Sequence, residues 1–159
     1  MLAFMRLSLG PDSAIERVGL LLNKVPVPAG QTFNAMAVAR TIGVAQRVGV
    51  FAALAGHPRT IDELAQELAL RSEPLRMMLD LLAGERLLDH RGSTYTVSHV
   101  ARRWVDPEST TYIGTWIEHT LDYWPWWADL ERVLRDGGSF EIHQADADDP
   151  SWPIYIRGQ

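Results

Sequence analysis

Apolar side chains recur at helical spacing through much of the chain, most clearly in its middle third. There they follow the i, i+3, i+4, i+7 pattern of a buried helical face, and they are Leu75, Met78, Leu79 and Leu82. We predict that Gly84 ends this helix, because glycine readily takes the left-handed conformation that closes many helices. A shorter apolar helix is predicted before it, from Ile61 to about Leu70.

Capping residues mark the predicted starts of both helices. Thr60 is followed three residues later by Glu63, so the hydroxyl and the carboxylate can each accept a hydrogen bond from the other residue's backbone N–H. Ser72 is the predicted N-cap of the second helix, and Pro74 falls in its first turn, where a missing N–H costs nothing. The caps and the apolar periodicity therefore predict the same helix–turn–helix order.

A β-hairpin is predicted directly after the second helix. Residues 87–90 and 94–97 flank Arg91-Gly92-Ser93, a glycine-containing connection short enough for a hairpin turn. Ser98 then caps one more short helix that runs through Trp104. Two helices followed by a hairpin have the order of a winged helix. We therefore expect a mainly α fold with a winged-helix core and a small β-hairpin wing.

Two apolar helices are predicted before this core. The first stops at the proline-containing segment 25–30, and its face consists of Ile15, Val18, Leu21, Leu22 and Val25. The second extends as far as Ala55, through Phe33, Met36, Ala37, Val44, Val48, Phe51 and Leu54. Since a small winged helix cannot cover both faces, we expect a homodimer, with interface candidates Ile15, Val18, Leu22, Phe33, Met36, Val44 and Val48. The alternative is that both helices pack only against their own core.

Aromatic residues are concentrated after the winged helix. Tyr112, Trp116, His119 and Tyr123 step by four, three and four residues along one predicted helical face. Pro125 is expected to kink or restart that helix, whose apolar face continues to Gly137-Gly138. Trp116 and His119 are the candidates for lining a small-molecule site, because they lie before the kink on the same face. The alternative is ordinary packing against the preceding helices.

Length and composition fit one compact domain of three consecutive parts: dimerisation helices in residues 1–56, the winged-helix core in 57–105, and aromatic-rich helices in 106–159. Hydrophobic residues make up 47% of the 159 positions, enough for a core. Apolar runs such as 18–22 are far below the roughly 20 residues needed to cross a bilayer, so no membrane partner is expected. The absence of cysteine is compatible with a cytoplasmic location, which we expect.

The order and spacing of six segments carry a family resemblance that covers nearly the whole chain. The segments are residues 33–54, 60–65, 75–82, Leu87-Leu88, 95–98, and Trp127-Ala128-Asp129-Leu130 running to Gly137-Gly138. Together they resemble the N-terminal dimerisation domain of class I S-adenosylmethionine-dependent O-methyltransferases, of the plant phenolic and bacterial polyketide-tailoring kind. The resemblance implies a helix-swapped homodimer that places a few side chains over a small-molecule acceptor. It also implies that the methyl donor and the catalytic base belong to a following Rossmann-like domain.

The glycines of this chain do not form the motif expected of that second domain. A methyl-donor site of this kind needs a Gly-x-Gly-x-Gly turn, because only glycine lets backbone N–H groups approach the cofactor closely. The 12 glycines include no Gly-x-Gly, and His143 is followed by Gln144 where the family has glycine. We therefore expect this chain alone to bind no cofactor and to be catalytically inert. S-adenosylmethionine is expected for a full-length parent enzyme with a C-terminal domain missing here; the alternative is a free-standing relative.

No catalytic or metal-ligating residue is predicted. The five histidines form no His-x-x-x-His pair, and no serine stands in a Gly-x-Ser-x-Gly setting. An acidic cluster beside Pro150 lacks the glycine and the terminal glutamate of a calcium loop and is predicted to be a solvated turn; it consists of Asp146, Asp148 and Asp149.

Two other functions remain open from the sequence. A winged helix often binds DNA, and a transcriptional regulator is the main alternative. However, residues 60–105 carry six arginines against seven acidic residues, and the whole chain has a formal net charge of −5, so DNA is an unfavourable partner. The third possibility is a stand-alone ligand-binding module that uses the tryptophan-rich region.

Overall fold

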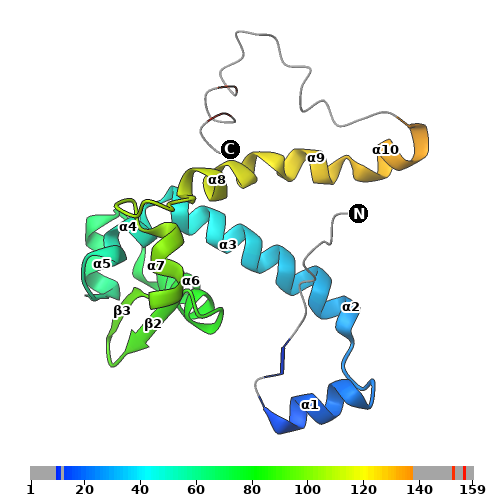
Figure 1. Ribbon diagram of the computed structural model, residues 1–159, viewed down its shortest axis with the longest axis horizontal. Helices are drawn as coiled ribbons and strands as arrows, with labels where there is room; N and C mark the ends of the chain where they lie inside the picture. The colour runs from blue at the N-terminus through cyan, green and yellow to red at the C-terminus, as the bar shows by residue number, and fades with distance from the viewer. Residues whose placement is uncertain (1–9, 12, 138–151, 153–155, 157–159) are drawn as a thin grey trace. The chain divides into compact units, whose positions relative to one another are not determined.

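The computed structural model describes residues 10, 11, 13–137, 152 and 156, and Figure 1 shows their helices and strands. The chain divides into two compact units, residues 1–39 and 40–159. The described residues are mostly helical and contain a small antiparallel sheet, which confirms the predicted mainly α fold. Among them, no helix is long and apolar enough to cross a membrane.

The first helix, α1 (Ala14–Leu21), begins at a capping box between Ser13 and Glu16. It ends before Val25, the last residue of the predicted face. Asn23 takes a left-handed conformation with φ of 53°, and the Lys24 N–H donates to the Gly19 carbonyl at 2.8 Å. This is a Schellman closure, and it stops the helix at Leu21.

The next helix begins earlier than predicted, inside the proline-containing segment. Three consecutive segments follow one another, α2 (Val27–Ala29), η1 (Gly30–Asn34) and α3 (Ala35–Arg47). Pro28 lies in the first turn, where it is tolerated because no intrahelical N–H bond is needed there. The η1 segment has π-helical geometry, and the Thr32 hydroxyl donates to the Pro28 carbonyl at 3.0 Å.

The prediction of a single helix running to Ala55 is wrong, because the helix is interrupted at Gly49. Gly49 has φ of +85°, a left-handed conformation that glycine adopts without steric cost. The separate helix α4 (Val50–Ala55) then follows. The change of direction brings three of its side chains into the core with no exposed surface, those of Val50, Phe51 and Leu54.

The next helix, α5 (Ile61–Glu67), confirms the predicted capping box. The Thr60 N–H donates to Glu63 Oε2 at 2.7 Å, and the Glu63 N–H donates to the Thr60 hydroxyl at 3.3 Å. The helix ends three residues before Leu70 because Ala69 is left-handed, with φ of 52°. The Leu70 N–H closes this second Schellman turn on the Ala65 carbonyl at 2.9 Å.

The predicted end of α6 (Ser72–Gly84) at Gly84 is confirmed, but its predicted N-cap and its left-handed closing residue need correction. Ser72 is the first helical residue rather than the N-cap, and its hydroxyl donates to Asp62 at 3.2 Å instead of capping the backbone. The left-handed closing residue is Arg86, with φ of 60°, and not Gly84. The buried stripe is confirmed, since Leu75, Leu79 and Leu82 are buried and Met78 packs against them.

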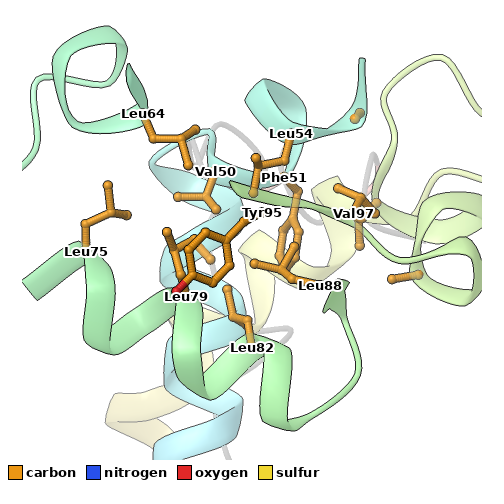
Figure 2. Packing of buried hydrophobic residues seen from close by; sticks show 14 of the residues in the cluster. Val50, Phe51, Leu54, Leu64, Leu75, Leu79, Leu82, Leu88, Tyr95 and Val97 are labelled. Carbon is orange, nitrogen blue, oxygen red and sulfur yellow. The ribbon is translucent and has the colours of Figure 1, made fainter. Parts of the chain in front are cut away.

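The predicted hairpin is confirmed as β2 (Leu88–Arg91) and β3 (Thr94–Val97), joined by a turn in which Gly92 has φ of 59°. A strand missed from the sequence, β1 (Arg59–Thr60), pairs with the other edge of β3 and gives the antiparallel order β1-β3-β2. Two residues are too short for a strand pattern to be recognised. Figure 2 shows the core between this sheet and the helices, with Tyr95 pointing toward Leu79 and Leu82.

Between residues 99 and 136, five helical segments follow the sheet. The helix α7 (His99–Val105) is capped by Ser98, as predicted, because the Ser98 hydroxyl accepts from the Ala101 N–H at 3.2 Å. The remaining segments are α8 (Gly114–His119), η2 (Thr120–Tyr123), α9 (Trp124–Ala128) and α10 (Leu130–Asp136). Pro125 lies in the first turn of α9, so the helix restarts there as predicted.

Candidate functional site

The aromatic segment from α8 to α9 lies against the second half of α3. Gly43 provides the closest approach, because a β-carbon at this position would lie 2.5 Å from Leu121 Cδ2. One helical turn before it, the Arg40 guanidinium lies over the Trp124 ring, 5.5 Å from its centroid. Glycine at position 43 therefore lets the Leu121 side chain of η2 lie directly against the backbone of α3.

Polar contacts extend the same interface toward the C-terminus of α3. Gln46 Nε2 donates to the Tyr112 hydroxyl at 2.8 Å in a half-buried setting. The Arg47 guanidinium reaches two carboxylates, Glu118 at 3.4 Å and Asp122 at 3.3 Å. Because these ion pairs are about half exposed, they fix the orientation of the helices more than they stabilise the fold.

His119 is enclosed by this arrangement. Only 5% of its surface is exposed, and Nδ1 lies 3.3 Å from Asp122 Oδ2. Its ring meets the Tyr123 ring edge-on at 4.9 Å, and Tyr123 in turn stacks on Trp126 at 4.7 Å. The result is a short column of three aromatic rings that begins with His119 and continues along η2 and α9.

The two residues predicted to line a small-molecule site have different surroundings. Trp116 keeps 49% of its surface exposed, whereas His119 is buried. Both lie on α8, three residues apart, as the helical spacing predicts. Spacing identifies a shared face, but burial depends on which neighbouring element covers each end of that face. Here the aromatic neighbours in η2 and α9 lie on the His119 side.

The interface candidates fall into two groups. Those on α1, its C-cap, η1 and the start of α3 are between 52% and 85% exposed, namely Ile15, Val18, Leu22, Phe33 and Met36. Val44 and Val48, near the end of α3, are half-buried and line an apolar groove. Exposed apolar side chains in such number favour an interaction surface over a solvated one.

The groove was not foreseen from the sequence. It has a volume of about 280 Å³ and lies between the end of α3 and the start of α6. Its lining comes from separate segments and consists of Val44, Val48, Leu70, Arg71, Pro74, Leu75 and Met78. No local pattern could reveal it, because the break at Gly49 and the turn after α5 bring these segments together.

The winged-helix face presents charges of both signs. On α6, the exposed side chain of Arg76 lies between two exposed acids, Glu73 and Asp80. Asp80 also accepts a hydrogen bond of 2.6 Å from the Tyr95 hydroxyl, and His90 stacks flat on the Tyr95 ring at 4.1 Å. Burial, followed by this hydrogen bond, raises the pKa of Tyr95 to about 12. These contacts tie α6 to the hairpin.

Metal-binding geometry is absent from the part of the chain that the structure describes, where no three histidine or acidic residues gather closely enough to hold an ion. The predicted acidic turn lies outside the described residues, as does His143; the turn consists of Asp146, Asp148 and Asp149.

Comparison with known proteins relates this geometry to one family. Residues 31–107 match the model of the O-methyltransferase dimerisation domain. The N,N-dimethyltransferase OxyT of Streptomyces rimosus is 28% identical over 100 residues, which are 62% of this chain and 29% of that protein. The chain thus spans less than a third of the length of this curated relative.

Solved structures share the fold. Human N-acetylserotonin methyltransferase, solved in complex with SAM, has a TM-score of 0.64 at 20% identity and covers 93% of this chain and 43% of that one. CalO1, a methyltransferase in calicheamicin biosynthesis in its SAH-bound form, has a TM-score of 0.63 at 20% identity, with 93% and 45% covered. An O-methyltransferase family protein from Burkholderia thailandensis has a TM-score of 0.58 at 21% identity, with 79% and 34% covered.

Proposed function

We propose, from the match of residues 31–107 to the O-methyltransferase dimerisation domain, that this chain is the dimerisation and substrate-lid part of a small-molecule, SAM-dependent methyltransferase. One observation carries the proposal. The apolar residues of α1, η1 and the start of α3 remain more than half exposed in a domain whose family is defined by self-association. A second copy of the chain is the partner that covers them.

The first experiment measures the mass of the chain by light scattering at micromolar concentration. We expect a homodimer with an interface at or above the ~1,600 Å² of a standard complex. Val18→Asp should shift the population toward monomer, because it places a charge in the apolar face of α1. Val100→Asp is the matched control, since Val100 on α7 is 80% exposed and lies outside the proposed interface. A wild-type chain that is monomeric contradicts the proposal.

The methyl donor does not fit the residues described here. The left-handed glycines Gly49, Gly92 and Gly137 are isolated from one another in the chain and form no cradle of successive backbone N–H groups. SAM and SAH occur in the structures of the similar methyltransferases. We propose that SAM is bound by a C-terminal domain of the whole enzyme and that this chain alone is inert. Titration calorimetry of the isolated chain should detect no heat of SAM binding, and a one-to-one complex contradicts this point.

The acceptor side of the proposal concerns Trp116 and His119. Trp116 offers a half-exposed aromatic surface, and His119, three residues further along α8, is an enclosed polar group. We propose that both line the acceptor site of the whole enzyme. There, Trp116→Ala should raise the Michaelis constant for the acceptor more than that for SAM. Trp127→Ala is the control, because Trp127 is 65% exposed on α9. Equal effects on the Michaelis constants for the acceptor and for SAM would mean that Trp116 only packs against its neighbours.

A further inference from the structure

The groove between α3 and α6 is built within one compact unit of the chain. Its lining is apolar except for one residue and consists of Val44, Val48, Leu70, Arg71, Pro74, Leu75 and Met78. All of these positions belong to the unit of residues 40–159, so the shape of the groove does not depend on where residues 1–39 lie. The exposed residues that support the proposed dimer, on α1, η1 and the start of α3, are not part of this lining.

The size and the lining of the groove are those of a site for a small, flexible ligand. Its volume of about 280 Å³ lies close to the lower limit of the ~300–1,000 Å³ found for small-molecule pockets. Leu75 is buried and forms the floor, whereas Val44, Val48 and Met78 are half-buried and form the sides. No aromatic ring lines the groove to stack on a flat ligand. The lining therefore favours a ligand with a short aliphatic body.

Arg71 is the charged residue of the lining. It is exposed, so its guanidinium lies on the solvent side of the groove. Arg47, Arg59 and Arg102 each pair with a carboxylate. No ion pair involves Arg71 among the residues that the structure describes. Because a guanidinium is always charged and its donors match the two oxygens of a carboxylate, Arg71 can orient an anionic group at the end of the aliphatic body.

From this combination we infer that the groove binds an aliphatic monocarboxylate, a short alkyl chain with one carboxylate at its end. The alkyl chain lies between Val48 and Met78, and the carboxylate pairs with Arg71. One guanidinium balances the single charge of a carboxylate, whereas a phosphate monoester carries almost two charges at neutral pH. The inference goes beyond the proposed function, because neither self-association nor methyl transfer requires this ligand.

Titration with straight-chain carboxylates tests the aliphatic part of the inference. Butyrate, hexanoate, octanoate and decanoate are added below their micelle-forming concentrations, and NMR follows the methyl groups of Val44, Val48, Leu75 and Met78. The affinity should rise about fourfold with each buried CH₂ group, because each one removed from water contributes a similar free energy. It should stop rising once the groove is full. Shifts that spare these four residues and occur only on α1 overturn the inference.

Ligands and variants that differ only in charge test the role of Arg71. Octanoate should bind more tightly than octan-1-ol, and octylamine more weakly. Arg71→Gln should lower the octanoate affinity about fivefold, the upper end for a solvent-exposed ion pair, and leave that for octan-1-ol unchanged. Arg76→Gln is the matched control, because Arg76 is exposed on α6, lies outside the lining and gives the same change in net charge. It should bind octanoate as the wild type does.

A larger side chain inside the groove tests its location. Val48→Phe should abolish binding of both octanoate and octan-1-ol, because the ring fills the space of the alkyl chain. Met77→Phe is its control, since Met77 is 72% exposed and does not line the groove. The NMR spectrum shows whether Val48→Phe folds, and the exposed position of Arg71 keeps the charge test available if it does not.

The outcomes separate this inference from the proposed function. Equal affinity for octanoate, octan-1-ol and octylamine, or equal losses in Arg71→Gln and Arg76→Gln, overturn the carboxylate site. A chain that is dimeric by light scattering but binds no carboxylate refutes this inference alone. A monomeric chain that binds octanoate through Arg71 refutes the proposed dimer and leaves the carboxylate site standing.

Discussion

Gly43 on α3 and Leu121 on η2 meet where no side chain larger than hydrogen fits on the glycine. A β-carbon built on Gly43 would lie 2.5 Å from Leu121 Cδ2 and 2.8 Å from Cγ, well inside van der Waals contact. Leu121 is itself buried, so it has little room to move away. The position of the aromatic segment on α3 therefore depends on the absence of one methyl group.

Gly43→Ala should lower the free energy of unfolding. Alanine favours a helix interior over glycine by about 1 kcal/mol, but overpacking costs about 1–3 kcal/mol, so we expect a net loss or a shift of the aromatic segment. Gly84→Ala is the control, because Gly84 is helical and has no atom within 4 Å of an added β-carbon; it should stabilise. Urea denaturation measures both. In a Leu121→Ala background the penalty at position 43 should disappear, and its persistence there contradicts the proposed contact.

Ala69→Gly should raise the free energy of unfolding by about 1 kcal/mol. Ala69 is exposed and takes the left-handed conformation that closes α5, which costs a residue with a β-carbon about 1–2 kcal/mol relative to glycine. The greater freedom of glycine in the unfolded chain offsets part of this gain. The measurement is the denaturant concentration at the midpoint of unfolding for the wild type and the variant, with the dependence of the unfolding free energy on denaturant unchanged. A loss of stability would show that the Ala69 methyl group makes contacts that exceed its backbone strain.

Thr60→Ala should destabilise the chain by about 0.5–2 kcal/mol, because it removes the hydroxyl that accepts from the Glu63 N–H at the start of α5. Ser72→Ala is the informative comparison. Ser72 follows a cap-like sequence pattern but makes no capping hydrogen bond, and its partner Asp62 is exposed, so this change should be nearly neutral. Equal losses in the two variants would mean that Ser72 supports α6 in a way that the geometry does not show.

Stability should fall at alkaline pH through Tyr95. The pKa of its phenol is raised from 10.0 to about 12 by burial and by the hydrogen bond to Asp80. A group whose pKa is higher in the folded state contributes stability below its unfolded pKa and loses it as the pH rises through the folded value. The unfolding free energy of the wild type should therefore decline relative to Tyr95→Phe between pH ~10 and ~12. If the unfolding free energies of the wild type and Tyr95→Phe change with pH in the same way, the raised pKa of Tyr95 is contradicted.

Features that depend on residues close together in the sequence were predictable. They are the capping box at Thr60, the buried stripe of α6, the β2–β3 hairpin and the Ser98 cap. The left-handed closing residues were not predictable, because Asn23, Ala69 and Arg86 hold positions where glycine is the expected residue. The strand β1 was not predictable either, because it forms by pairing with β3, which lies more than 30 residues away in the sequence.

The candidate site shows the same difference between local features, which were predictable, and features that depend on distant residues, which were not. Helical spacing placed Trp116 and His119 on one face, but it could not show that packing around η2 buries only the second. The groove is assembled from α3, the turn after α5 and α6, so no window of the sequence contains it. Long-range packing, rather than local preference, decides which apolar residues are available for function.

Consecutive residues of α3 face different neighbours. Gly43 admits Leu121 of the aromatic segment, and Val44 lines the aliphatic groove. Successive residues of an α-helix point about 100° apart, so the aromatic segment and the groove lie on two different sides of one helix. A rotation of α3 about its axis would therefore change both surfaces at once.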